Sequence, residues 1–179
     1  MSYFLTSARL GFRHWRDDDL SFALELWGDP RVSLPLGGPF TPQQIRARLD
    51  QQIAQMSETG LQLWPIFLLE DSSFAGCAGL RPWRPEQRIH EIGYHLIPSN
   101  WGKGLATEAA STVINHAFGP LAAEALFAGH HPDNDASRRV LIKLGFQYTG
   151  DAFYEPTNWI EPQYLLHRPR RKSASVQSS

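Results

Sequence analysis

The sequence predicts a mixed α/β fold in which an antiparallel meander meets a βαβ-like unit. Strand-like runs at 62–69, 73–81 and 88–97 are joined by short turn segments, which is typical of antiparallel strands. A glycine-rich turn and a helical stripe then lead from the third run to a further strand at 125–130. Strands and helices thus follow one another along a single chain, as expected for an α+β sheet covered by helices.

The segment before the meander predicts one strand and two helices. Apolar residues alternate over 9–13, as in a half-buried strand, and a first helix is expected over 17–27 behind three aspartates. Residues 31–40 are expected to form an irregular loop. The capping box at 41–44, with proline at the first helical position, predicts a second helix that ends at Gly60.

The second half predicts two more helices and three more strands. An i, i+4 apolar stripe marks a helix over 105–117, and the strand at 125–130 follows it. Asn134 is expected to cap a short helix that ends at Gly145. Strands near 146–154 and 163–167 complete a predicted total of about seven strands and four helices.

Length and composition restrict the classes of protein that fit. The 179 residues predict one domain over 1–167, followed by a flexible basic and polar tail over 168–179. A net charge of −1 argues against a nucleic acid or a membrane as partner. The single cysteine, Cys77, indicates a reducing compartment, and the first 15 residues lack a long apolar run. We therefore expect a cytoplasmic protein.

The stretch "NWGKGLATEA" at 100–109 places two glycines directly before a helix. A helix N-terminus offers unpaired N–H groups and a partial positive charge, which suit a phosphate. The P-loop pattern fails because Gly104 follows Gly102-Lys103 where serine or threonine is required. A dinucleotide fingerprint is weak because Thr107 occupies the place of its third glycine.

A third kind of phosphate loop identifies a family. The segment 101–106, Trp-Gly-Lys-Gly-Leu-Ala, resembles the [QR]-x-x-G-x-[GA] loop of the GCN5-related N-acetyltransferases (GNAT), with Trp101 in place of glutamine or arginine. The runs "EIGYHL" (91–96), "NDASRRVLIKLGF" (134–146) and "DPRVSLPLGGPFTPQQ" (29–44) are similar to other family segments in the right order. The resemblance covers about residues 8–167, and the branch most similar is that of the ribosomal-protein N-terminal acetyltransferases.

The resemblance implies a mostly antiparallel sheet of six to seven strands, opened by a V-shaped cleft. It also implies an enzyme that moves an acetyl group from acetyl-CoA to a primary amine, with a protein N-terminal α-amine as the expected acceptor, and a monomer or homodimer. A small amine of the aminoglycoside or polyamine type is an alternative acceptor, and a non-catalytic acyl-CoA-binding module is the alternative class. The residues expected to bind the cofactor are Leu96, Ile97, Trp101, Gly102, Lys103, Gly104, Leu105, Ala106, Thr107, Asn134 and Ser137.

Acetyl transfer needs a neutral amine, donors for the thioester oxygen and a proton for the departing thiolate. Glu91 is the candidate base, directly or through a water, and an ordinary solvated strand glutamate is its alternative interpretation. His95 is a second candidate for the proton. Many family members carry a tyrosine acid where Ile142 stands, which makes Ser137 the candidate acid; simple capping of the helix is the other reading of Ser137.

Other side chains that attract attention have plainer interpretations. Cys77 lies in an apolar strand and is expected to be a small buried residue, so direct transfer is favoured over a covalent intermediate. His130 and His131 are adjacent on a strand and point to opposite faces, so no metal site is expected there with Asp133. Aromatic side chains that could line the acceptor pocket, although a core position is preferred for each, are Trp27, Phe40 and Trp83.

Overall fold

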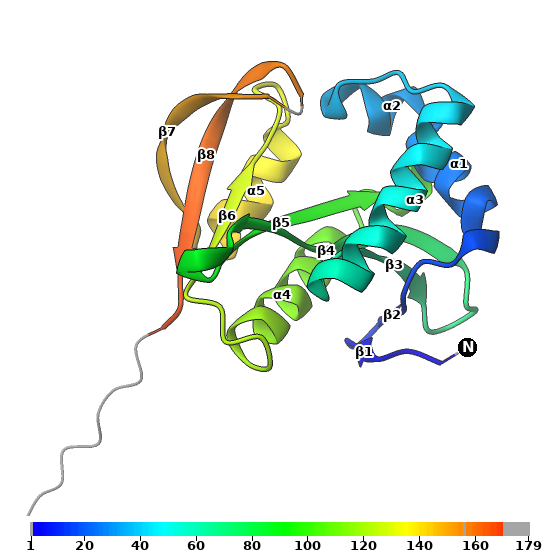
Figure 1. The fold of residues 1–179 in the computed structure, drawn as a ribbon, viewed down its shortest axis with the longest axis horizontal. Helices are drawn as coiled ribbons and strands as arrows, with labels where there is room; N and C mark the ends of the chain where they lie inside the picture. The colour runs from blue at the N-terminus through cyan, green and yellow to red at the C-terminus, as the bar shows by residue number, and fades with distance from the viewer. Residues whose placement is uncertain (1, 156, 170–179) are drawn as a thin grey trace, which may run out of the picture.

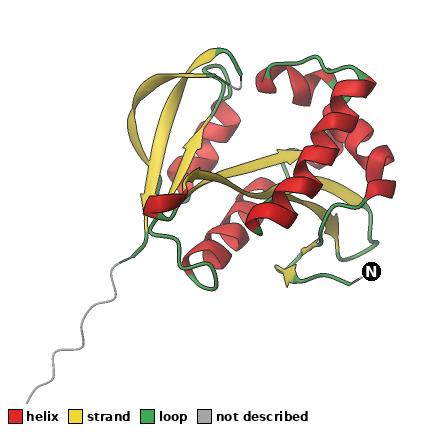
Figure 2. Cartoon of the chain, in the orientation of Figure 1, coloured by secondary structure: helices red, strands yellow, loops and turns green. Residues whose placement is uncertain are grey.

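The computed structural model describes residues 2–155 and 157–169 and shows one mixed sheet covered by helices on both faces (Figures 1 and 2). The predicted tail over 168–179 lies outside the described residues beyond Pro169. The strands are β1 (Leu5–Thr6), β2 (Leu10–Phe12), β3 (Leu63–Leu68), β4 (Phe74–Arg84), β5 (Ile89–Leu96), β6 (Ala125–Gly129), β7 (Gln147–Tyr154) and β8 (Trp159–His167). The helices are α1 (Leu20–Trp27), α2 (Pro30–Ser33), α3 (Pro42–Thr59), α4 (Leu105–Phe118) and α5 (Asp135–Lys143).

The strand order is β1-β2-β3-β4-β5-β6-β8-β7, and every neighbouring pair is antiparallel except β5 and β6. These two strands pair in parallel only over Ile89–Glu91 and Ala125–Phe127. Beyond Glu91, β5 continues to pair with β4 but leaves β6. The sheet therefore opens into the V-shaped cleft that the sequence predicted.

The sheet has eight strands among the described residues, and five α-helices cover it, so the predicted seven strands and four helices were too few. The additional strand, β1, is two residues long, and the additional helix, α2, has four residues. Periodicity needs several residues before it can be recognised, so such short elements give no pattern in the sequence. The segment over 31–40 was expected to be irregular; Asp29 instead caps α2, and a 3₁₀ turn at Leu34–Leu36 follows.

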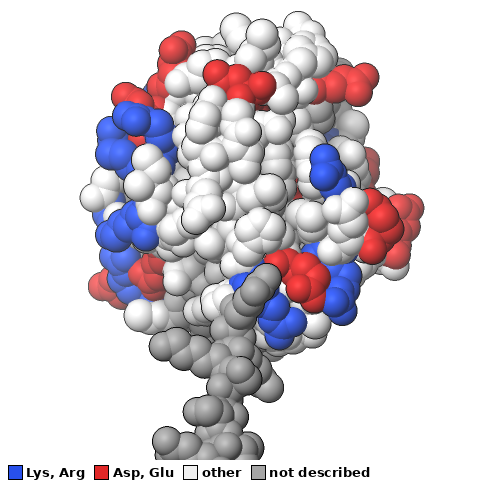
Figure 3. Space-filling model, turned by 90° about the vertical axis from the view of Figure 1, so that its left-hand side faces the viewer, with Lys and Arg blue, Asp and Glu red and all other residues white. Residues whose placement is uncertain are grey.

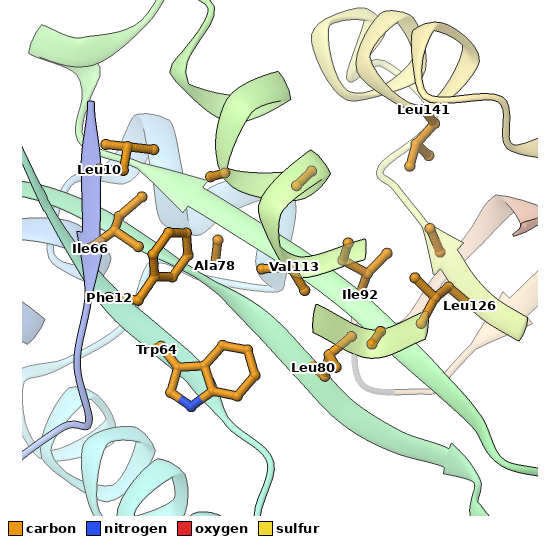
Figure 4. Packing of buried hydrophobic residues seen from close by; sticks show 14 of the residues in the cluster. Leu10, Phe12, Trp64, Ile66, Ala78, Leu80, Ile92, Val113, Leu126 and Leu141 are labelled. Carbon is orange, nitrogen blue, oxygen red and sulfur yellow. The ribbon is translucent and has the colours of Figure 1, made fainter. Parts of the chain in front are cut away.

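Two hydrophobic cores, one on each face of the sheet, hold the helices in place. Helices α4 and α5 pack on one face, and Figure 4 shows Val113 of α4 and Leu141 of α5 directed at strand residues such as Ile92. Helices α1 and α3 pack on the other face with residues such as Trp27. The i, i+4 stripe predicted for α4 is buried as expected.

The ends of α3 show why local sequence places a helix so reliably. The Thr41 hydroxyl accepts from the Gln44 N–H, the Gln44 side chain accepts from the Thr41 N–H, and Pro42 begins the helix. Gly60 ends it in the left-handed conformation, with φ of 73°. The capping box and the glycine stop are both confirmed.

The surface beside β7 and β8 is largely free of charge. Exposed hydrophobic side chains on these strands include Tyr148, Phe153 and Ile160. Figure 3 shows a mostly uncharged central band on this side of the molecule, with acidic and basic residues intermixed along its margins. Within the described residues, no helix has both the length and the apolar character needed to cross a membrane.

Candidate active site

The glycine loop before α4 adopts a backbone that explains its composition. Gly102 and Gly104 have φ of 73° and 76°, in the left-handed region that side chains other than glycine rarely adopt. Gly104 is the N-cap of α4, and no side chain caps this helix end. The N–H groups of Leu105, Ala106 and Thr107 belong to the first helical turn, which has no intrahelical acceptors for them. An uncapped helix N-terminus of this kind is typical of anion-binding sites.

Hydrogen bonds and an ion pair from the N-terminal segment hold this loop, and they were not predicted from the sequence. Arg9, just before β2, donates to the Lys103 carbonyl at 3.0 Å and forms an ion pair of 2.6 Å with Glu108 of α4. The Ser7 hydroxyl also donates to Glu108, at 2.7 Å. About a hundred residues separate Ser7 and Arg9 from their partners, so no local pattern could have revealed these contacts.

Trp101, which departs from the family pattern, links the glycine loop to β5. Its indole N–H donates to the Leu96 carbonyl at 2.8 Å, which ties the loop to the end of β5. The ring is half exposed at the mouth of the cleft. A tryptophan can therefore fasten the strand to the loop, because its side chain carries both a donor and a large apolar surface.

A cavity of about 960 Å³ runs from this loop along the open half of the V. Its walls come from the loop and α4, from the end of β5, from α5, and from residues 31–38. Most of the residues predicted to bind the cofactor line it: Leu96, Trp101, Gly102, Gly104, Leu105, Ala106, Thr107, Asn134 and Ser137. Two others do not, since Ile97 is buried in the α1–α3 core and the Lys103 ammonium donates to Asn100.

A smaller cavity of about 100 Å³ adjoins the first and contains Glu91. Tyr94, His95, Asn134 and Ser137 line both cavities, so the two share a wall. The Glu91 side chain is buried beneath this wall, on the same face of β5 as His95. The structure thus places the candidate base, Glu91, in the smaller cavity.

Glu91 is not an isolated carboxylate. Its Oε1 accepts from the Arg81 guanidinium at 2.8 Å, and both of its oxygens accept from the Tyr154 hydroxyl at 2.9 Å. Arg81 is the cross-strand neighbour of Glu91 on β4, whereas Tyr154 comes from β7, far along the chain. These two partners fix the orientation of the carboxylate, and neither was predicted.

Asn134 and Ser137 have distinct roles at the N-terminal end of α5. The Asn134 side chain caps α5 by accepting from the Ser137 N–H at 3.0 Å. The Ser137 hydroxyl makes no hydrogen bond with another described residue, and Ser137 lines both cavities. Capping is therefore carried out by Asn134, and the hydroxyl of Ser137 is available to the cavities. Ile142, where the family resemblance implied a tyrosine in many members, is 57% exposed and lines neither cavity.

His95 is held as a neutral ring. The Trp27 indole N–H lies 3.3 Å from His95 Nδ1, and because an indole N–H only donates, Nδ1 accepts and the ring proton is assigned to Nε2. Burial, with the positive charges of Arg48 and Arg81, lowers the pKa of His95 to about 3. Neither ring nitrogen is then suited to take a proton from an amine near neutrality.

Other candidates take structural positions. Cys77 is fully buried, and burial raises the pKa of its thiol to about 12, which makes it a poor nucleophile. Trp27 belongs to the core and Trp83 stacks on Phe127 at 4.0 Å. Neither tryptophan lines one of the two cavities, and Phe40 does not line them either. His130 stacks on Tyr164 and His131 meets Trp159 edge-on. Within 2–155 and 157–169, no three metal-ligating side chains come together.

Comparison with known proteins identifies the family. The family described as Acetyltransferase (GNAT) domain matches residues 9–147. The chain is 30% identical over 148 residues to p20, an uncharacterized N-acetyltransferase of Bacillus licheniformis, covering 82% of this chain and 83% of that one. The chain belongs to the GNAT acetyltransferase family. It is therefore an acetyl-CoA-dependent N-acetyltransferase.

Solved structures show the same fold. A GNAT-family acetyltransferase from Bacillus anthracis superimposes with a TM-score of 0.79 and 22% identity, covering 92% of this chain and 98% of that one. RimL, a ribosomal-protein α-N-acetyltransferase solved in complex with coenzyme A, superimposes with a TM-score of 0.77 and 18% identity, covering 90% and 95%. The predicted fold class and family are thus confirmed.

Proposed function

We propose that this enzyme acetylates a protein N-terminal α-amine by direct attack of the amine on acetyl-CoA in a ternary complex. The observation that carries the proposal is that the two cavities have lining residues in common. The cavity at the glycine loop therefore lies directly beside the chamber of Glu91. The similarity of the fold to RimL supports this acceptor class. Because the cysteine is kept as a buried thiol, we also propose a reducing, cytoplasmic setting.

The loop residues fit the phosphates of coenzyme A. The N–H groups at 105–107 have no capping side chain and are available to bind an anion. The two left-handed glycines keep the approach to the backbone free of Cβ atoms. Leu96 and Tyr94 of β5 and Asn134 of α5 provide the opposite walls for the remaining length of the molecule. When bound, the coenzyme supplies an activated acetyl thioester.

Glu91 is proposed as the proton acceptor, directly or through a water. An α-amine is largely protonated at pH 7, so a base near the point of attack increases the reactive fraction. The Arg81 and Tyr154 hydrogen bonds keep the carboxylate in one orientation within the smaller cavity. Free backbone N–H groups on the open half of β5 are proposed to stabilise the developing oxyanion, since this half has no β6 partner.

Ser137 is proposed to donate to the departing thiolate. We expect Ser137→Ala to lower kcat about tenfold with little change in the acceptor KM, because one hydrogen bond to a charged group is lost. Its melting temperature should stay close to that of the wild type, since the hydroxyl bonds no other described residue. Steady-state kinetics and a thermal melt of the same preparation measure both quantities.

Asn134→Ala provides the matched control at the same helix end. Removing the side chain that accepts from the Ser137 N–H should cost about 1 kcal/mol of stability. A destabilised Ser137→Ala protein with normal turnover would assign the serine to the helix and not to the thiolate.

The acceptor class is tested by following the release of free thiol from acetyl-CoA. The panel contains peptides with free α-amines, the same peptides with blocked N-termini, aminoglycosides and polyamines. We expect turnover with the free peptides only. Turnover confined to the small amines would replace the proposed acceptor, and binding of acetyl-CoA without turnover on a broad peptide panel would contradict the proposed N-terminal acetylation.

A further inference from the structure

A second carboxylate, Glu161 of β8, lines the same small cavity as Glu91. Its side chain comes from the opposite half of the sheet, where Glu161 pairs across the β7–β8 hairpin with Ala152. Only 3% of the residue is exposed. The sequence analysis did not single it out, because its approach to β5 depends on strands that are far apart in the chain.

The hydrogen bonding of Glu161 leaves one oxygen free. The Thr157 hydroxyl donates to Oε1. No described residue donates to Oε2, and a Cβ added at Gly129, which lines the same cavity, would lie 2.9 Å from this atom. One oxygen of a nearly buried carboxylate thus lies without a donor next to a lining residue of the chamber that contains the proposed base.

Glu161 also forms no ion pair with another described residue. Arg81, the guanidinium that lines this cavity, is in an ion pair with Glu91, and no ion pair to Glu161 forms within the described residues. The neighbouring imidazoles form no ion pair with Glu161 either. His130 Nδ1 donates to the His131 carbonyl at 2.8 Å, and burial lowers the pKa of His130. His131 Nδ1 accepts from the Asp133 N–H.

An unpaired carboxylate in a buried cavity is costly, because burial disfavours the charged form. Burial raises the pKa of Glu161 and the negative charge of Glu91 adds to this, whereas the Thr157 hydrogen bond and the electrostatic interactions with His131 and Arg81 act in the opposite direction. Arg81 is ion-paired with Glu91, so the Glu161 carboxylate has no ion-pair partner of its own. A small cation that enters the cavity would remove this cost.

We infer that Glu161 is a binding site for the ammonium form of the acceptor. The identification of this cation as the acceptor rests on the proposed function. The class of acceptor selected is an aliphatic amine, which is protonated near neutrality, in preference to an aromatic amine, which is not. Glu161 binds the cation through Oε2, and Glu91 then takes the proton, so the two carboxylates have separate tasks.

The kinetic test compares Glu161→Gln with Asp151→Asn, an exposed carboxylate on the same hairpin. Glu161→Gln should raise the KM of the best aliphatic acceptor by about tenfold or more while kcat changes by less than about threefold, since a charge-assisted contact is lost from binding alone. Asp151→Asn should leave both constants unchanged. An unchanged KM in Glu161→Gln, or a loss confined to kcat, would overturn the inference.

A second measurement does not depend on turnover. The ¹³C carboxyl signal of Glu161 is followed against pH in the wild-type enzyme, in sodium chloride and then in ethylammonium chloride at the same ionic strength. We expect the pKa of Glu161 to fall in ethylammonium, because a bound cation favours the carboxylate. An identical titration in both salts would show that no cation binds. A fall without acetyl transfer to any amine would retain the cation site and reject the proposed function.

Discussion

Replacing Gly104 with valine should abolish the thermal stabilisation of the enzyme by acetyl-CoA. In the wild type, ligand at about 100 times its Kd should add about 2.7 kcal/mol to the stability. At φ of 76° a β-branched residue is strained, and its side chain would stand beside the N–H groups proposed to receive the phosphates. We expect the Kd for acetyl-CoA to rise by about a hundredfold or more, as measured by calorimetry.

Gly60→Val separates this effect from backbone strain. Gly60 has φ of 73° at the end of α3, and a Cβ added there would meet no atom within 4 Å. The two variants should lose similar stability without ligand, while only Gly104→Val loses the response to acetyl-CoA. A full response in Gly104→Val would place the phosphates elsewhere, and a clear response to NAD or ATP alone would reject the cofactor.

Glu91→Gln should lower kcat by about a hundredfold or more near neutral pH. The change keeps the size of the side chain and an oxygen that can accept from Arg81, and it removes the basic carboxylate. The Kd for acetyl-CoA should barely change, because Glu91 lines only the smaller cavity. Pre-steady-state and steady-state rates with a saturating acceptor measure the effect on chemistry.

Tyr154→Phe is the matched control for Glu91. It removes the hydroxyl that donates to both carboxylate oxygens but keeps the charge and the Arg81 ion pair. We expect a loss of kcat well below that of Glu91→Gln, since orientation is weakened and the base remains. If Glu91→Gln costs tenfold or less, the amine loses its proton elsewhere and Glu91 is a structural partner of Arg81.

Sequence reasoning recovered the parts of this enzyme that depend on local patterns. The capping box of α3, the apolar stripe of α4 and the Asn134 cap of α5 each follow from interactions within a few residues, and each lies where the sequence predicted. The glycine loop belongs to the same group, because its left-handed residues are specified by composition alone.

The parts that the sequence did not reveal are contacts between distant segments. Arg9 with Glu108, Tyr154 with Glu91, and Glu161 with its cavity each join residues that only the folded sheet brings together. A charged residue on a short strand looks the same in the sequence whether it faces water or a cavity. Only the register of β6, β7 and β8 decides between these possibilities.

The segment over 31–38 forms part of the wall of the larger cavity, and its Pro35 and Leu36 reach the smaller one, yet it belongs to no strand of the sheet. The proposed base and the glycine loop are carried by the sheet and α4, whereas this wall is carried by one short helix and a turn. This wall and the residues proposed for the chemistry are thus encoded in separate stretches of the gene. Exchanging about eight codons would therefore reshape one side of both cavities while the sheet, the glycine loop and Glu91 are inherited unchanged.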